Sequence, residues 1–315
     1  MSVLQSPVAS METPPNPPPV APTVHRRPYS RRMYLSERAL KFLYAGSWPA
    51  RLWSWLPGGL EVQRVEQDLP LGTERPGRPP LRVGFVSDLH LGPTTPLRLV
   101  ENAFDALREA RLDVLALGGD YVFLGASPQR MERLTRLVAS VPARTKVAVL
   151  GNHDFWARPE RVVDALTRAG ANVLLDHGLR LPPPHDDIGI IGLDDPLTSR
   201  QLFDAGAARA GVDRALGALP AGVSSVIAVA HSPDTLPALQ GRGVSILLCG
   251  HTHGGQIALP GYRPLVMPSR MGRRYPFGLH RLEDGLTLFV SRGLGTSMVP
   301  LRTWAPEDLA VFNVG

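Results

Sequence analysis

Cysteine, lysine and long apolar runs are all scarce in this chain of 315 residues. The single cysteine, Cys249, has no partner for a disulfide within the chain, so a disulfide-stapled scaffold is excluded. No stretch of about 18 residues is both apolar and free of charge, which excludes a protein with several membrane-spanning helices. Lysine occurs only as Lys41 and Lys146, beside abundant arginine and alanine, a composition typical of GC-rich bacterial genomes.

The formal net charge of +6 is concentrated near the start of the chain. Residues 1–51 carry seven basic and two acidic side chains, so the remaining residues are nearly neutral. A nucleic-acid-binding domain needs an excess of positive charge to hold the phosphate backbone. The charge distribution therefore argues against nucleic acid as a partner.

The first 59 residues divide into two segments of different composition. Residues 1–30 contain eight prolines and few large apolar side chains, which predicts a disordered arm. Residues 31–59 interleave aromatic and leucine side chains with Arg38, Lys41 and Arg51, a pattern typical of a helix lying on an anionic membrane surface. The same pattern fits a helix packed on its own domain with its tryptophans in the core, and periodicity does not separate these alternatives.

The run 30–35 superficially matches a twin-arginine export signal. Such a signal continues into an uncharged apolar stretch, which Glu37, Arg38 and Lys41 interrupt. We therefore expect a cytoplasmic protein, with peripheral contact to the inner membrane through residues 31–57. Twin-arginine export is the less favoured alternative.

From about residue 60, short apolar strands alternate with amphipathic helices. This alternation predicts an α/β fold, in which ligand-binding groups collect in loops at the carboxyl ends of strands. The predicted helices span 96–110, 128–140 and 161–169. The predicted strands span 81–86, 114–117, 146–150, 188–193, 226–230 and 246–249.

The loops that follow these strands share one chemistry, because each places histidine, aspartate or asparagine beside glycine or serine. An isolated histidine is more often a surface or core residue than a ligand, but five such loops at successive strand ends favour a common metal site. Imidazole and carboxylate together suit Mn, Fe or Zn, whereas Mg and Ca favour oxygen ligands alone. The polar residues of these loops are Asp88, His90, Asp120, Asn152, His153, His231, His251 and His253.

The order of these motifs resembles that of the calcineurin-like metallophosphoesterase superfamily. The matching motifs are Asp88-Leu89-His90, Gly119-Asp120, Gly151-Asn152-His153-Asp154, His231 and Gly250-His251-Thr252-His253. Later runs, including Gly254-Gly255-Gln256-Ile257 and Ser291-Arg292-Gly293-Leu294-Gly295, resemble the YkuE/YaeI-type branch. The resemblance implies a two-layer β-sandwich flanked by helices, with residues 60–315 as the catalytic domain.

The resemblance also implies a pair of divalent metal ions, Mn, Fe or Zn. Asp88, His90, Asp120 and His253 would hold the first ion, and Asp120, Asn152, His231 and His251 the second. A shared carboxylate keeps two ions about 3.5–4 Å apart, where both polarise one phosphoryl group and lower the pKa of bound water towards about 7. A hydroxide nucleophile then exists at neutral pH without a protein base.

His153 lies beside a predicted ligand but is not itself needed as one. We therefore expect His153 to protonate the leaving oxygen or to stabilise the transition state, with a structural hydrogen-bonding role as the alternative. Asp154 is expected to cap its loop. Phosphoprotein phosphatases of this superfamily carry an Asp-Arg pair where Phe123 and Leu124 stand here, so other residues must orient His153 and a phosphoserine substrate is not expected.

These patterns predict a dimetal phosphoesterase that hydrolyses phosphate mono- or diesters. The basic aromatic segment favours a phospholipid or lipid-linked substrate, and the branch includes enzymes of bacterial envelope lipid metabolism. The alternatives are a soluble cyclic-nucleotide or general phosphodiesterase and a non-catalytic metal-binding regulatory protein. Arg263, Arg270, Arg273 and Arg274 would bind an anionic headgroup or form a solvated basic face.

Overall fold

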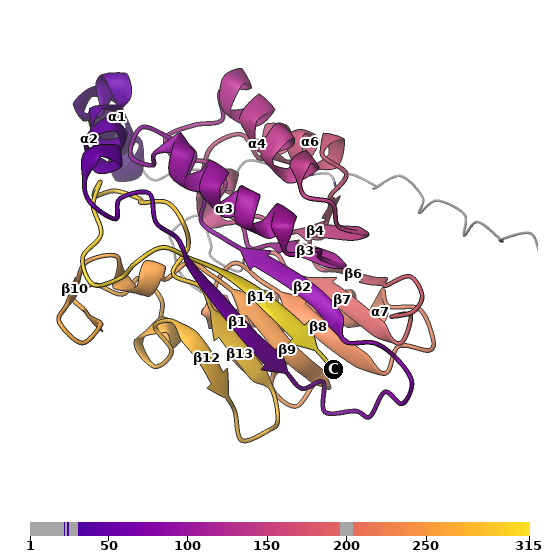
Figure 1. The fold of residues 1–315 in the computed structure, drawn as a ribbon. Coiled ribbons are helices and arrows are strands. Elements are labelled where there is room, and N and C mark those ends of the chain that lie inside the picture. The colour runs from indigo at the N-terminus through magenta and orange to yellow at the C-terminus, as the bar shows by residue number, and fades with distance from the viewer. Residues whose placement is uncertain (1–21, 23, 25–30, 196–203) are drawn as a thin grey trace, which may run out of the picture.

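The computed structural model describes residues 31–195 and 204–315 together with Pro22 and Val24 (Figure 1). The arm predicted to be disordered, residues 1–30, falls outside the described residues apart from these two.

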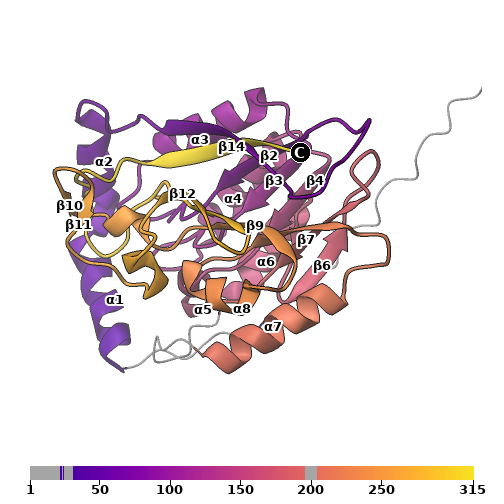
Figure 2. The same ribbon diagram turned by 90° about the horizontal axis from the view of Figure 1, so that it is seen from below.

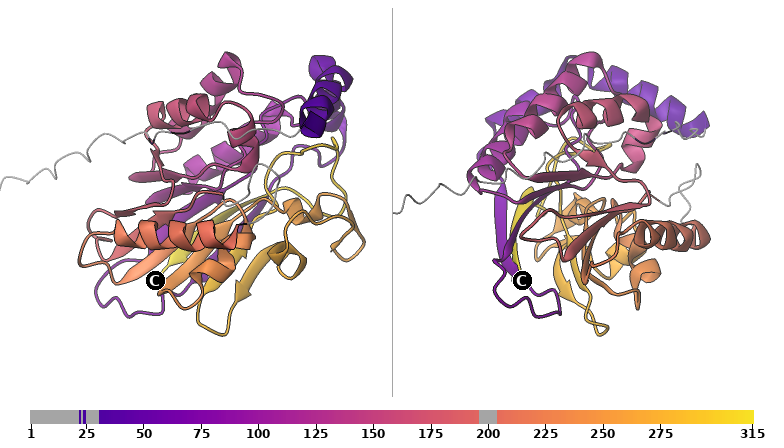
Figure 3. Two further views of the ribbon diagram at one scale, coloured as in Figure 1. Left: turned by 180° about the vertical axis from the view of Figure 1, so that it is seen from behind. Right: turned by 90° about the vertical axis from the view of Figure 1, so that its right-hand side faces the viewer.

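Two six-stranded sheets stack face to face, and helices cover the outer face of each (Figures 1 and 3). This arrangement confirms the predicted α/β fold, a two-layer β-sandwich flanked by helices. The first sheet has the order β1 (Gln63–Leu69), β14 (Asp308–Val314), β2 (Leu81–Val86), β3 (Val114–Leu117), β4 (Thr145–Ala148), β5 (Asn172–Val173). The second has the order β12 (Gly278–Arg281), β13 (Thr287–Val290), β9 (Val244–Cys249), β8 (Ser225–Val229), β7 (Ile188–Gly192), β6 (His177–Arg180). A short hairpin pairs β10 (Ala258–Leu259) with β11 (Arg263–Pro264).

The outer helices bury one apolar face each against a sheet. In α3, Leu99, Val100, Ala103 and Phe104 recur at helical spacing and are buried. Pro128 begins α4, and the preceding serine accepts a capping hydrogen bond at that end of the helix. The first sheet is covered by α3 (Leu97–Glu109), α4 (Pro128–Ser140) and α6 (Pro159–Arg168), and the second by α7 (Ala205–Gly217) and α8 (Leu236–Leu239).

The space between the two sheets is filled by aliphatic and aromatic side chains. Phe289 of the second sheet makes edge contacts with Phe85 and Phe312 of the first, with ring centroids 6.1 and 5.0 Å apart. The central strands are covered on both faces, which explains why β3 reads as a continuous apolar run and why Arg82 is the only charged residue of β2.

The central strands of each sheet run parallel, so their carboxyl ends meet at one edge. β2, β3 and β4 are mutually parallel in the first sheet, and β7, β8 and β9 are parallel in the second. The loops after these strands therefore face one another across the edge of the sandwich. The predicted ligands all belong to these loops.

The basic aromatic segment forms two helices, α1 (Arg31–Leu43) and α2 (Trp48–Trp55), at one side of the sandwich (Figure 2). Tyr44 and Ala50 attach them to the domain: the Tyr44 hydroxyl donates to the Met298 carbonyl at 2.7 Å, and Ala50 is buried. Trp48 and Trp55 remain exposed, so the helices pack on the domain without using these tryptophans as core. Among the described residues, no helix combines the length and apolar character needed to cross a membrane.

Candidate metal centre

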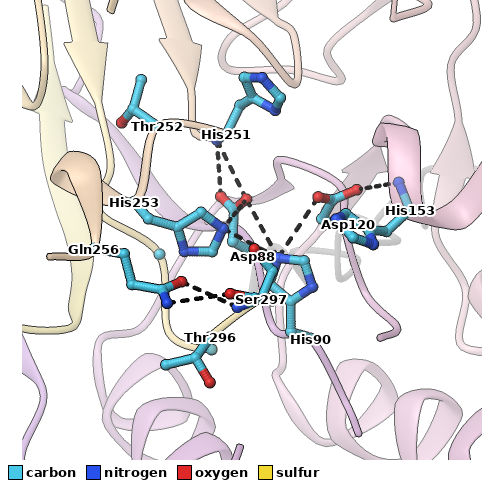
Figure 4. A network of polar contacts seen from close by, with 12 residues as sticks. Asp88, His90, Asp120, His153, His251, Thr252, His253, Gln256, Thr296 and Ser297 are labelled. Atoms are coloured by element: carbon cyan, nitrogen blue, oxygen red, sulfur yellow. Dashed lines mark hydrogen bonds and ion pairs between the residues drawn. The ribbon is translucent and has the colours of Figure 1, made fainter. Parts of the chain in front are cut away.

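The seven predicted ligands come from five loops and meet at the shared edge of the two sheets. Figure 4 shows five of them, Asp88, His90, Asp120, His251 and His253. The first cluster contains Asp88, His90 and His253. The Nε2 atoms of His90 and His253 lie 3.1 Å apart, and Nε2 of His253 lies 3.4 Å from Oδ1 of Asp88. Asp88, His90 and His253 therefore each offer one ligand atom to the same small volume.

The second cluster contains Asp120, Asn152, His231 and His251. Nε2 of His231 lies 3.3 Å from Oδ2 of Asp120, 3.2 Å from Oδ1 of Asn152 and 3.1 Å from Nδ1 of His251. The same Oδ2 of Asp120 lies 3.6 Å from Nε2 of His90 in the first cluster. The carboxylate of Asp120 therefore stands between the two clusters.

The spacing of these donor atoms fits divalent metal ions. With metal–ligand bonds of about 2.0–2.2 Å, neighbouring ligands of one ion lie roughly 3.0–3.5 Å apart. Burial lowers the pKa of His90, and burial together with the charge of His231 lowers the pKa of His251 to about 3. Both imidazoles are therefore neutral near pH 7, the form in which a ring nitrogen offers its lone pair to a metal.

Five of the seven residues hold a left-handed backbone conformation. Such a conformation costs a non-glycine residue roughly 1–3 kcal/mol and persists where the surrounding structure imposes it. Several residues in this conformation within a few loops are typical of a functional site. The five residues are Asp88, His90, Asp120, His251 and His253, with φ between 42° and 70°.

Gly151 and Gly250 leave room for the two buried carboxylates. A Cβ atom at Gly151 would lie 2.2 Å from Oδ1 of Asp120, and one at Gly250 would lie 2.2 Å from Oδ2 of Asp88. The carboxylates cannot move aside freely, because Oδ1 of Asp120 already accepts a hydrogen bond from the His153 backbone at 2.8 Å. These two positions therefore require glycine.

Asp154 joins two of the loops through its buried carboxylate. It accepts hydrogen bonds from the backbone N–H groups of Asp120 at 2.8 Å, Tyr121 at 2.9 Å and Gly151 at 3.0 Å. This agrees with the interpretation of Asp154 as a loop-capping residue.

Residues 81–255 match the calcineurin-like phosphoesterase family. The chain belongs to this family. It is 28% identical to a metallophosphoesterase of Aquifex aeolicus over 81% of the chain and 91% of that protein. It is 28% identical to the metallophosphoesterase YkuE of Bacillus subtilis, over 72% of the chain and 77% of YkuE. It is 27% identical to the phosphodiesterase YaeI of Escherichia coli, over 75% of the chain and 82% of YaeI.

These matches confirm the predicted superfamily and its YkuE/YaeI-type branch. The chain is therefore a metal-dependent hydrolase of phosphoric ester bonds, and the clusters described above are its candidate metal-binding groups.

In this phosphoesterase, aromatic rings hold the side chain of His153. Its ring centroid lies 4.9 Å from that of His90, 5.5 Å from that of Phe123 and 4.9 Å from that of Trp156. Phe123 belongs to the Phe123-Leu124 pair that stands in place of the expected Asp-Arg pair, and its ring contacts that of His153. Burial lowers the pKa of His153, and the negative charge of Asp120 opposes this shift.

A cavity of about 380 Å³ lies over the candidate metal-binding groups of the phosphoesterase. Asp120, Asn152, His153, His251 and His253 line its inner end. Much of the remaining lining is apolar and includes Leu40, Phe123, Leu124, Trp156, Pro268 and Met298.

One wall of this cavity was not foreseen from the sequence. Ser36, Glu37 and Leu40 of α1 line it, although α1 lies outside the family match of residues 81–255. The spacing of these three positions fits one face of a helix. Nothing in the sequence connected that face to the loops that line the cavity, which lie more than 50 residues further along the chain.

Arg302 is a second residue that the motifs did not indicate. Its buried guanidinium has Nη2 3.0 Å from Nδ1 of His253 and donates a hydrogen bond to the Arg292 carbonyl at 2.8 Å. Arg302 therefore connects a predicted ligand to the loop that follows β13.

Proposed function

We propose that this phosphoesterase hydrolyses phosphate mono- or diesters at a centre of two divalent metal ions. Asp88, His90, Asp120 and His253 hold the first ion, and Asp120, Asn152, His231 and His251 hold the second. One observation carries the proposal: the carboxylate of Asp120 lies within 3.6 Å of a ring nitrogen in each of the two buried clusters. Because the donors mix imidazole and carboxylate, Mn, Fe and Zn suit the site best.

Two ions held there supply a hydroxide nucleophile at neutral pH and neutralise charge on the phosphoryl oxygens. His153 is the proposed proton donor to the leaving oxygen. Its half-buried ring lines the cavity beside the clusters and is held by Phe123 and Trp156. The imidazolium form of His153, which the charge of Asp120 favours against the effect of burial, donates a ring N–H proton to the leaving oxygen as the bond between that oxygen and phosphorus breaks.

The apolar lining of the cavity supports a phospholipid or lipid-linked ester as substrate. Leu40, Phe123, Leu124 and Met298 offer contacts to an apolar group attached to the phosphate. We assign residues 60–315 as the catalytic domain and residues 31–59 as a basic aromatic amphipathic segment, which makes peripheral membrane contact through residues 31–57. The proposed location is the cytoplasmic side of the inner membrane.

The test measures metal content and hydrolysis on the full chain. Purified protein is loaded with Mn, analysed by mass spectrometry and assayed with bis(p-nitrophenyl) phosphate, then with a panel of phospholipids and nucleotides. We expect two equivalents of metal and a turnover that a chelator abolishes and Mn restores. A fully loaded protein without turnover would support a metal-binding regulatory protein instead, and hydrolysis of cyclic nucleotides alone would support a soluble phosphodiesterase.

A further inference from the structure

Among the described residues, the exposed large apolar side chains are confined to three segments. Within residues 34–195 and 204–315, all of them lie in the helical segment 34–56, the hairpin segment 259–266 or the late loop 298–304. Phe42 is 87% exposed, Trp55 82% and Val266 70%. Scattered single apolar residues are normal on a protein surface, but a confinement of this kind indicates an interaction surface.

Direct contacts join the three segments into one apolar face. The Tyr44 hydroxyl binds the carbonyl of Met298, which connects the end of α1 to the late loop. Ala258 at the base of the hairpin donates to the Thr303 carbonyl at 2.9 Å. Figure 2 shows α1, α2, β10 and β11 together at one side of the molecule. A groove lined by Trp53, Leu56, Tyr262 and Trp304 runs between α2, the hairpin and the late loop.

The apolar face borders the catalytic cavity. Leu40 of α1 lines the cavity, and Leu43, which is 55% exposed, lies three residues further along, a spacing at which two side chains share one face of a helix. Met298, which is 49% exposed at the start of the late loop, also lines the cavity. An ester that reaches the protein at this face therefore arrives beside His153 and the metal-binding clusters.

The charge around the apolar face is strongly basic. Residues 31–58 carry five basic side chains and one acidic residue, Glu37, which is paired with Lys41 at 2.7 Å. Residues 256–275 carry four arginines and no acidic residue. Within the described part of the chain, no carboxylate pairs with the guanidinium of Arg263, Arg270, Arg273 or Arg274. A second copy on the same face would oppose arginine with arginine, whereas anionic headgroups complement it.

We infer that this apolar face docks on a bilayer containing anionic phospholipid and presents the mouth of the catalytic cavity to the membrane surface. The inference rests on the proposed function and adds the hairpin segment, the late loop and the arginines Arg263, Arg270, Arg273 and Arg274 to the helical segment. Tyrosine and tryptophan side chains, as at Tyr34, Trp48, Trp55 and Trp304, suit the boundary between acyl chains and headgroups. The arginines lie where headgroup phosphates would meet them.

The first experiment measures co-sedimentation of the full chain with vesicles. Vesicles of phosphatidylcholine with phosphatidylglycerol are compared with vesicles of phosphatidylcholine alone. We expect the wild type to bind the anionic vesicles, and the combined variant Phe42→Gln, Trp55→Gln, Val266→Gln to bind them at least tenfold more weakly, because each change removes exposed apolar surface. Equal binding of this variant and the wild type would overturn the docking face.

A charge variant tests the basic rim with a matched control. Arg263→Gln, Arg273→Gln and Arg274→Gln together are expected to weaken binding to phosphatidylglycerol vesicles by at least tenfold. The control variant Arg98→Gln, Arg108→Gln, Arg136→Gln removes the same charge from α3 and α4 and is expected to bind like the wild type. An equal loss in both variants would mean that net charge, rather than this face, drives binding, and would contradict the inference.

Activity in solution separates this inference from the proposed function. Each preparation is assayed with bis(p-nitrophenyl) phosphate and Mn in the absence of vesicles, and its molar mass is measured by light scattering. Activity without vesicle binding refutes the docking face alone, whereas vesicle binding without activity refutes the proposed function alone. A dimer that the apolar variant converts to a monomer, without vesicle binding by the wild type, would identify the face as a self-association surface and overturn the inference.

Discussion

The inner end and the α1 wall of the catalytic cavity are built in different ways. At the inner end, the ligand loops are buried and joined by backbone hydrogen bonds, such as those that Asp154 accepts from three N–H groups. At the wall, α1 is amphipathic and exposed along most of its length, and Tyr44 just after it provides the buried contact. The inner end therefore has the rigidity that chemistry requires, while the wall borders the surface where substrates arrive.

This difference suggests that the ligand loops and α1 have separate functions. Residues of the ligand loops should control turnover on every substrate, because they position the reacting groups. Leu40 of α1 should control which esters are bound, because it contributes apolar lining to the cavity and is not a candidate metal ligand. Variants of the two regions test that separation.

The largest effect is expected for Asp120→Asn. This change removes a negative charge from between the two clusters, so metal content falls and kcat/KM decreases by roughly a thousandfold or more. Metal analysis and hydrolysis of bis(p-nitrophenyl) phosphate measure both quantities. The control Asp105→Asn, on the exposed face of α3, should leave them unchanged. Full metal content in Asp120→Asn would contradict the assigned role.

His153→Ala should retain metal but lose turnover by about 10²–10⁴-fold on an alkyl ester, as expected for a lost proton donor. The loss should be much smaller on a nitrophenyl ester, whose leaving group departs without a proton. Kinetics on both esters, with exposed His177→Ala as the control, distinguish this role from a structural one. Equal losses of turnover on both esters would contradict the role of His153 as a proton donor.

Gly250→Ala tests whether turnover depends on the exact position of the Asp88 carboxylate. The new methyl group would lie 2.2 Å from Oδ2 of Asp88, and a displacement of that carboxylate by about 1 Å should cost roughly a hundredfold in turnover. Gly217→Ala is the matched control, because a Cβ atom there meets nothing within 4 Å. A Gly250→Ala protein with normal activity would show that the loop adapts.

The smallest effect is expected for Leu40→Ala in the α1 wall. Loss of one apolar contact in a pocket should raise KM by about tenfold for an ester with an apolar tail. Turnover of bis(p-nitrophenyl) phosphate should change less than about threefold, because the metal-binding groups are untouched. Leu216→Ala is the control, because this half-buried leucine of α7 belongs neither to the cavity lining nor to the apolar face. A large loss of turnover on both substrates would show that α1 contributes to the chemical step and would contradict the separate roles of the two regions.

The inner end of the cavity was predictable from the sequence because its residues follow apolar strands directly. The bounds of β2, β3 and α4 agree with the predicted ranges 81–86, 114–117 and 128–140. Once parallel strands are recognised, their carboxyl ends must share an edge, so the meeting of Asp88, Asp120 and His231 follows. That these residues bind metal remains a prediction.

The wall and the edge of the first sheet were not predictable, because contacts distant in sequence determine them. The bond from Tyr44 to Met298 joins residues 254 positions apart. β1 reads as a polar segment with most of its side chains exposed, and only its pairing with β14 makes it a strand. The orientation of His153 also escaped prediction, since sequence motifs report on charged partners better than on ring packing.

The position of β14 has a consequence for the order of assembly. β14 is inserted between β1 and β2, parallel to the first and antiparallel to the second. Asp308 at its start binds the Arg292 backbone, and the neighbouring Gly293 packs against the Cβ of Asp88. During synthesis, β1 must therefore wait for more than 200 further residues to leave the ribosome before it finds its neighbour. Asp88 reaches its final surroundings at the same late stage, so metal uptake is expected to follow the synthesis and insertion of β14.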